Sequence, residues 1–182
     1  MKKIKRALYI YLIFLFLSVI TSACCKTNYQ IIGNGSITAY DSESGETFTE
    51  DIIGTIIGGF RIDVNHEISI ATGTDFNLSF IQSAYATSCG ENYENDLDGS
   101  TLKISTNKDF IYDGILIEQG SNLTDIEGLD YDFGFGGISV RFNEEFVNRM
   151  EFINEVYEFK FEISTTDGME LVNIINLKFE IE

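Results

Sequence analysis

FRIDVNHEISI, residues 60–70, is the stretch of this sequence that decides its fold. The even-numbered residues from Phe60 to Ile70 are apolar except for His66, and the odd-numbered residues between them are polar. A period of two residues is typical of a β-strand that has one face on a core and the other in water. The stretch therefore predicts a long strand over 60–70.

The C-terminal region carries the same alternation on both sides of a turn signal. Its apolar residues occupy odd positions: Tyr157, Phe159, Phe161, Ile163, Met169, Leu171, Ile175, Leu177, Phe179 and Ile181. Odd positions can oppose odd positions only across a loop with an odd number of residues. We therefore expect a hairpin with the three-residue loop Thr166-Asp167-Gly168, in which Gly168 takes a positive φ.

Shorter segments bounded by Gly, Asn or Asp complete the pattern. Further strands are expected at 36–40, 102–105, 115–117 and 138–142. Asn143 is a good helix N-cap, with Glu144 and Glu145 in the first turn, and a short helix is expected to place Phe146, Met150 and Ile153 on one stripe. Together these elements predict a mainly β fold, an antiparallel β-sandwich with one short helix, for which an immunoglobulin-like arrangement is the first choice.

The charge balance limits the classes of partner. Without the four cations in the first six residues, eight basic residues stand against 29 acidic ones, a net charge of −21. These eight cations are scattered singly along the sequence, whereas nucleic acid binding needs a clustered basic face. We expect no nucleic acid partner, and solubility is the plainest role for the acidic surface.

The N-terminus has the layout of a secretory signal. A basic stretch from Lys2 to Arg6 precedes an apolar run over 7–20 and the small residues Thr21-Ser22-Ala23. At about 1.5 Å per residue the run would span roughly 21 Å as a helix, less than a hydrocarbon core of about 30 Å. Residues 1–23 are therefore predicted to be a signal peptide rather than a permanent membrane span, with residues 24–182 forming one β-sandwich domain.

Cys24 lies where a lipid anchor would be attached. Thr21-Ser22-Ala23-Cys24 is similar to a bacterial lipobox, although Thr21 replaces the usual Leu and the same residues suit an ordinary signal peptidase. Lipidation of Cys24 would leave Cys25 and Cys89 free to form a disulfide in an oxidising compartment. The alternative for Cys89 is a buried free thiol.

Several segments of the mature chain resemble a known family. These are the Cys24-Cys25 start, residues 83–89 (SAYATSC), residues 102–105 (LKIS) and residues 120–123 (GSNL). Together they resemble uncharacterised lipoproteins of Bacteroidota. The resemblance implies an outer-membrane lipoprotein with a cysteine partner for Cys89, and it brings no known activity. The residues that follow Cys24 lack the acidic side chains typical of surface-exported lipoproteins, so the periplasmic face is expected rather than the cell surface.

The candidate chemical sites are few. His66 is the only histidine, and its place on the apolar face of a strand favours a core or rim residue with one hydrogen-bond partner over a catalytic one. Asp130 and Asp132 would share a face if extended, as an acid/base pair or weak cation ligands, and a glycine-rich loop explains them equally well. Residues 96–100 (DLDGS) begin like a calcium loop but lack the closing glutamate.

The sequence thus predicts a lipid-anchored cell-envelope protein that is a non-enzymatic binding or structural module without a cofactor or a metal. Its expected partners are the lipid bilayer and an envelope protein or glycan, or it serves as an accessory subunit of an envelope complex. The alternative is an envelope hydrolase that uses the carboxylate pair Asp130 and Asp132.

Overall fold

The computed structural model of the 182-residue chain describes the following residues: 6, 8–13, 27–48, 59–72, 92–134, 136–151 and 155–179. The chain forms two compact units, one of Met1–Gln30 with Ser69–Glu94 and one of Ile31–Ile68 with Asn95–Glu182. In the first unit, residues 8–13 are helical and the start of β1 pairs in parallel with β3. The second unit holds most of the described strands and the core.

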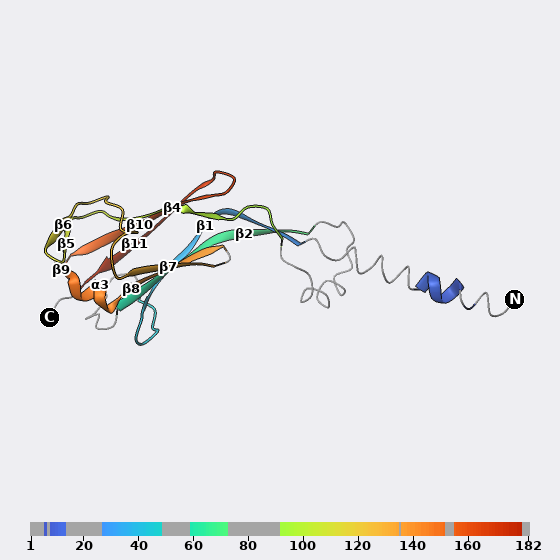
Figure 1. Cartoon of the computed structure of the whole chain (residues 1–182), viewed down its shortest axis with the longest axis horizontal. Coiled ribbons are helices and arrows are strands. Elements are labelled where there is room, and N and C mark those ends of the chain that lie inside the picture. The colour runs from blue at the N-terminus through green and yellow to red at the C-terminus, as the bar shows by residue number, and fades with distance from the viewer. Residues whose placement is uncertain are drawn as a thin grey trace. The chain divides into compact units, whose positions relative to one another are not determined.

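Strands make up most of the described chain (Figure 1). The strands and the helix in chain order are β1 Thr27–Asp41, β2 Gly59–Thr72, β3 Asn92–Tyr93, β4 Leu97–Thr106, β5 Phe110–Tyr112, β6 Ile115–Ile117, β7 Leu129–Gly134, β8 Gly137–Asn143, α3 Glu144–Arg149, β9 Met150–Glu151, β10 Val156–Thr165 and β11 Glu170–Lys178. They form a five-stranded sheet in the order β3-β1-β2-β8-β7 and two three-stranded sheets, β11-β10-β4 and β6-β5-β9.

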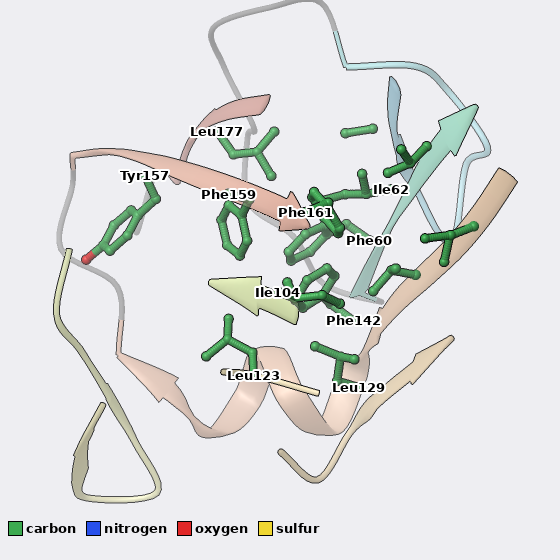
Figure 2. Close-up of a cluster of buried hydrophobic side chains, with 14 of the residues drawn as sticks. Phe60, Ile62, Ile104, Leu123, Leu129, Phe142, Tyr157, Phe159, Phe161 and Leu177 are labelled. Atoms are coloured by element: carbon green, nitrogen blue, oxygen red, sulfur yellow. The ribbon is translucent and has the colours of Figure 1, made fainter. Parts of the chain in front are cut away.

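Aromatic side chains join the five-stranded sheet and the β11-β10-β4 sheet into a sandwich. Phe60 on β2 stacks on Phe142 on β8, with ring centroids 4.3 Å apart. The ring of Phe159 on β10 meets both edge-on, with its centroid 6.2 Å from Phe60 and 5.5 Å from Phe142 (Figure 2). All three are almost fully buried, and burial of a side chain of this size contributes roughly 1.5–3 kcal/mol. The mainly β sandwich expected from the sequence is therefore confirmed, and the immunoglobulin-like arrangement stays a prediction.

The strand over 60–70 is confirmed within β2. Phe60, Ile62 and Val64 are buried as the alternation requires, whereas Ile70 at the far end is exposed. Burial therefore fades along β2 because an alternating pattern predicts a face but not the length of sheet that covers it.

The C-terminal hairpin has the predicted register. Tyr157 lies opposite Leu177 and Ile163 opposite Leu171, so odd residues face odd residues throughout β10 and β11. The Thr165 amide donates to the Met169 carbonyl at 2.9 Å, which closes a loop of the three residues 166–168, and Gly168 has a φ of 91°. The parity of the apolar positions was thus sufficient to predict the turn.

Other boundaries differ from the expected ones. The strand expected at 36–40 is the end of the fifteen-residue β1, and β3, β5, β7 and β9 were not predicted. Asn143 caps α3 by accepting a hydrogen bond from the Phe146 amide, but the helix ends at Arg149. Met150 therefore begins β9 instead of extending the helical stripe, and Ile153 lies outside the described residues.

Candidate functional site

The outward face of the five-stranded sheet brings two arginines together. Arg61 on β2 and Arg141 on β8 are direct partners in the antiparallel register. Their inward neighbours Phe60, Ile62 and Phe142 are buried, so the pleat directs both guanidinium groups away from the core. The β-carbons of directly opposed residues lie about 4.5–5.5 Å apart, which places two positive charges side by side.

Two neighbouring side chains contact the guanidinium group of Arg61, although its Nε has no hydrogen-bond partner among the described residues. Its guanidinium carbon lies 4.8 Å from the centroid of the Tyr40 ring, a cation–π contact. Its Nε lies 3.2 Å from Asp63 Oδ1, and the same carboxylate oxygen accepts a 2.8 Å hydrogen bond from Ser139 Oγ. Nε of Arg61 faces Asp63, and one face of the guanidinium group covers the Tyr40 ring. The two terminal amino groups can therefore donate hydrogen bonds to another acceptor.

The turn that follows β1 forms one side of this site. Asp41 Oδ1 accepts hydrogen bonds from the amides of Glu43 at 2.9 Å and Ser44 at 2.6 Å. These bonds lower the pKa of the Asp41 carboxyl below its ordinary value, led by the bond from the Ser44 amide. Asp41 therefore stays ionised at neutral pH and contributes one negative charge.

A surface hollow of about 340 Å³ lies between the turn and the two arginines. The residues that line it are Tyr40, Asp41, Ser42, Gly45, Arg61 and Arg141. Its lining supplies two cations, one carboxylate and two hydroxyl groups, with no aliphatic side chain. The hollow is suited to a polar, negatively charged ligand.

Arg141 differs from other cations of the described chain. Lys108 forms an ion pair with Glu155. Lys103 and Lys160 both form ion pairs with Glu162. Arg149 forms ion pairs with Glu127 and Glu145. Arg141 forms no ion pair with any described residue, although Asp130 is its register partner on β7. In a chain with a large excess of carboxylates, this cation faces another arginine and has no ionic partner among the residues that the structure describes.

Asp130 and Asp132 lie on a strand and not in a glycine-rich loop, which corrects the loop interpretation. Both are exposed on β7, opposite Arg141 and Ser139 of β8, so they share the outward face that an extended chain predicts. Neither lines the hollow. Within the described residues no three His, Cys, Asp or Glu side chains are grouped to hold a metal ion.

His66 is buried, as its place on the apolar face predicted. It is 6% exposed, and burial lowers the pKa of its imidazole. The expected hydrogen-bond partner is not found, because both ring nitrogens lack one in the described part of the chain. His66 is therefore a buried residue whose imidazole is neutral at neutral pH.

The calcium-like segment serves local turns. Asp98 Oδ1 accepts hydrogen bonds from the amide and hydroxyl of Ser100, and Asp96 Oδ1 accepts one from the amide of Leu97. These carboxylates therefore order the start of β4.

The anchor and disulfide predictions lie outside the described residues, since Cys24, Cys25 and Cys89 all do. None of the helices in the part of the chain that the structure describes is long and apolar enough to cross a lipid bilayer.

The arginine pair was missed by sequence reasoning. Both residues fall on the polar phase of an expected strand, 60–70 for Arg61 and 138–142 for Arg141, and this signal places each on an outward face. Arg61 and Arg141 each stand singly in the sequence, eighty positions apart, and they become direct neighbours only in the sheet. Only the pairing of β2 with β8 brings them together.

Comparison with known proteins shows little sequence relationship. No family model matches the chain, and no curated protein matches it. Among solved structures, the C-terminal domain of the Streptococcus pyogenes antigen I/II-family protein AspA is similar over 81% of this chain and 46% of that chain, with 9% identity and a TM-score of 0.28. A chain described as BspA_C_WT is similar over 80% of this chain and 50% of its own, with 10% identity and a TM-score of 0.28. This chain thus spans about half the length of the structures it matches.

Proposed function

We propose that this protein is a lipid-anchored lipoprotein of the bacterial cell envelope whose β-sandwich acts as a non-enzymatic binding module. The observation that carries the proposal lies in the N-terminal segment that precedes Cys24. Residues 8–13 form a helical segment in which six consecutive large apolar side chains are 52 to 72% exposed. Exposure of such an apolar surface to water is unfavourable in free energy. The surface is suited to the hydrophobic region of a signal peptide in a membrane.

The distance between the anchor and the fold supports the same proposal. β1 begins at Thr27, three residues after Cys24. Three extended residues reach about 10 Å, so a lipid on Cys24 would hold the start of β1 close to the membrane surface. The anchor would then serve to keep the module near envelope partners.

The test is an intact mass measurement on the protein extracted from membranes of its native host. We expect a chain that starts at Cys24 and carries a diacylglycerol and an added acyl group. Cys24→Ser should abolish the lipid, whereas the matched control Cys25→Ser should retain it. An unlipidated wild-type chain that starts at Cys24 in the soluble fraction would contradict the anchor.

Two further measurements address the disulfide and the location. Peptide mapping without reduction should show Cys25 joined to Cys89, and alkylation of both thiols in the native protein would contradict the bond. Protease treatment of intact cells should leave the protein undigested on the periplasmic face. Its degradation would indicate display on the cell surface.

A further inference from the structure

We propose that the hollow bounded by Arg61, Arg141 and Tyr40 binds a singly charged carboxylate carried on a polar sugar, such as a uronic acid residue of an acidic glycan. The inference rests on the proposed role as a binding module and names the class of ligand that the module takes.

The charge distribution points to an anion at this place. Like charges directly opposite each other weaken a pair of strands, and any neutral residue at position 141 would remove the repulsion between Arg61 and Arg141. A bound anion between the two guanidinium groups converts the repulsion into attraction. Arg141 is the better anion acceptor of the two because no described carboxylate forms an ion pair with it.

The geometry favours a carboxylate. A guanidinium group presents its N–H donors in a planar fork that matches the two oxygens of a carboxylate. The ion pair with Asp63 and the contact with the Tyr40 ring restrict the guanidinium group of Arg61, so its terminal amino groups are partly oriented before a ligand arrives. A ligand that meets an oriented donor loses less of its binding free energy to ordering that side chain.

The local charge limits the ligand to one negative charge. Asp41 lines the hollow and is ionised, and Asp63 already faces Arg61. With a strongly negative chain around the site, a dianion such as phosphate would meet more repulsion than a monoanion.

The polarity of the lining favours a sugar as the carrier of the carboxylate. Tyr40 and Ser42 supply hydroxyl groups, and no aliphatic side chain lines the hollow. A fatty acid tail or an apolar peptide side chain would find no Leu, Ile, Val or Met side chain to pack against, and Arg61 already covers one face of the Tyr40 ring. The hydroxyl groups of a pyranose can form hydrogen bonds with such a lining.

The test uses the mature chain from Cys24, purified in detergent and labelled with ¹⁵N-arginine. Of the four arginines in the sequence, Arg6 lies in the proposed signal peptide, so the spectrum of the mature chain has three arginine Nε–H signals. Titration with galacturonic acid, which carries one carboxylate, should shift the signals of Arg61 and Arg141. The signal of Arg149, which pairs with Glu127 and Glu145, should stay in place and serves as an internal control.

Matched variants identify the group that binds. Arg141→Gln should weaken binding of galacturonic acid by about tenfold, the usual effect of losing a hydrogen bond to a charged group. Arg141→Lys keeps the positive charge but loses the planar pair of N–H donors, so its affinity should lie between those of the wild type and Arg141→Gln. Lys103→Gln removes one positive charge from a different sheet and should leave the affinity unchanged.

Four outcomes would overturn the proposal. These are equal binding of the methyl ester of galacturonic acid, tighter binding of inorganic phosphate, tighter binding of an acidic peptide, or equal losses in Arg141→Gln and Lys103→Gln. Failure here would leave the lipid anchor standing, because the mass of the mature protein tests the anchor separately.

Discussion

The side chain of Asn95 pairs with the backbone of Ile31 as a neighbouring strand residue would. The Ile31 amide donates to Asn95 Oδ1 at 2.8 Å, and Asn95 Nδ2 donates back to the Ile31 carbonyl at 3.1 Å. Asn95 Nδ2 also donates to Asp167 Oδ2 at 3.1 Å, in the loop between β10 and β11. One buried amide thus ties β1 to the C-terminal hairpin.

Asn95→Ala should lower the free energy of unfolding by about 1–3 kcal/mol, because it leaves two buried backbone groups of Ile31 without partners. Urea denaturation measures the loss. Asn95→Asp should be at least as harmful, since a carboxylate cannot donate to Ile31 and would repel Asp167. Asn176→Ala, on the exposed face of β11, is the control, and an equal effect of Asn95→Ala and Asn176→Ala would contradict this role.

Gly168→Ala should destabilise the hairpin through its backbone alone. The φ of 91° is unfavourable for a residue with a side chain, yet nothing lies within 4 Å of an added β-carbon. The expected loss is about 1–2 kcal/mol in thermal or urea unfolding. Gly134→Ala also meets nothing within 4 Å and has no positive φ, so it should have little effect. Similar losses in both variants would rule out strain as the cause.

Stability should fall as the pH is lowered from 7.5 to 5.5, and His66 should be the cause. Burial lowers the pKa of His66 in the folded protein, while an unfolded histidine titrates near pH 6.5. As the pH falls through this value the unfolded chain binds a proton that the folded chain does not, so unfolding becomes easier. His66→Leu should remove this slope, because the chain has one histidine.

The carboxyl groups do not obscure this measurement. Hydrogen bonds lower the pKa values of Asp41 and Asp167, led by the Ser44 amide for Asp41 and by the Thr165 side chain for Asp167. The stabilisation of the folded protein by these two carboxylates is fully present above pH 3.9, the approximate pKa of an aspartate in the unfolded chain. It is lost only at lower pH. An unchanged slope in His66→Leu would therefore contradict the assignment.

Arg141→Thr should stabilise the ligand-free protein even though it removes the proposed anion site. Relief of the repulsion from Arg61 is expected to contribute about 0.2–1 kcal/mol, and threonine suits a strand. The gain should shrink in concentrated salt, which screens exposed charges. Lys103→Thr removes a cation that faces Glu162 and should give no gain. Destabilisation by Arg141→Thr at low salt would show that the repulsion is not significant.

The sequence by itself determined the local features of this protein. The alternation over 60–70, the parity of the C-terminal apolar residues and the cap at Asn143 each depend on residues close together in the chain, and the structure has all three. These features follow from backbone geometry, which assigns each side chain to a face. They also predicted the mainly β sandwich.

Only the tertiary structure decided which faces and residues meet. Alternation places Arg61 and Arg141 on outward faces but does not say that β2 pairs with β8, and no local pattern connects Asn95 with Ile31. Strands such as β7 escaped prediction because their side chains are mostly exposed and show no alternation. Strand pairing depends on contacts between distant residues, so the candidate site exists only once the sheet has formed.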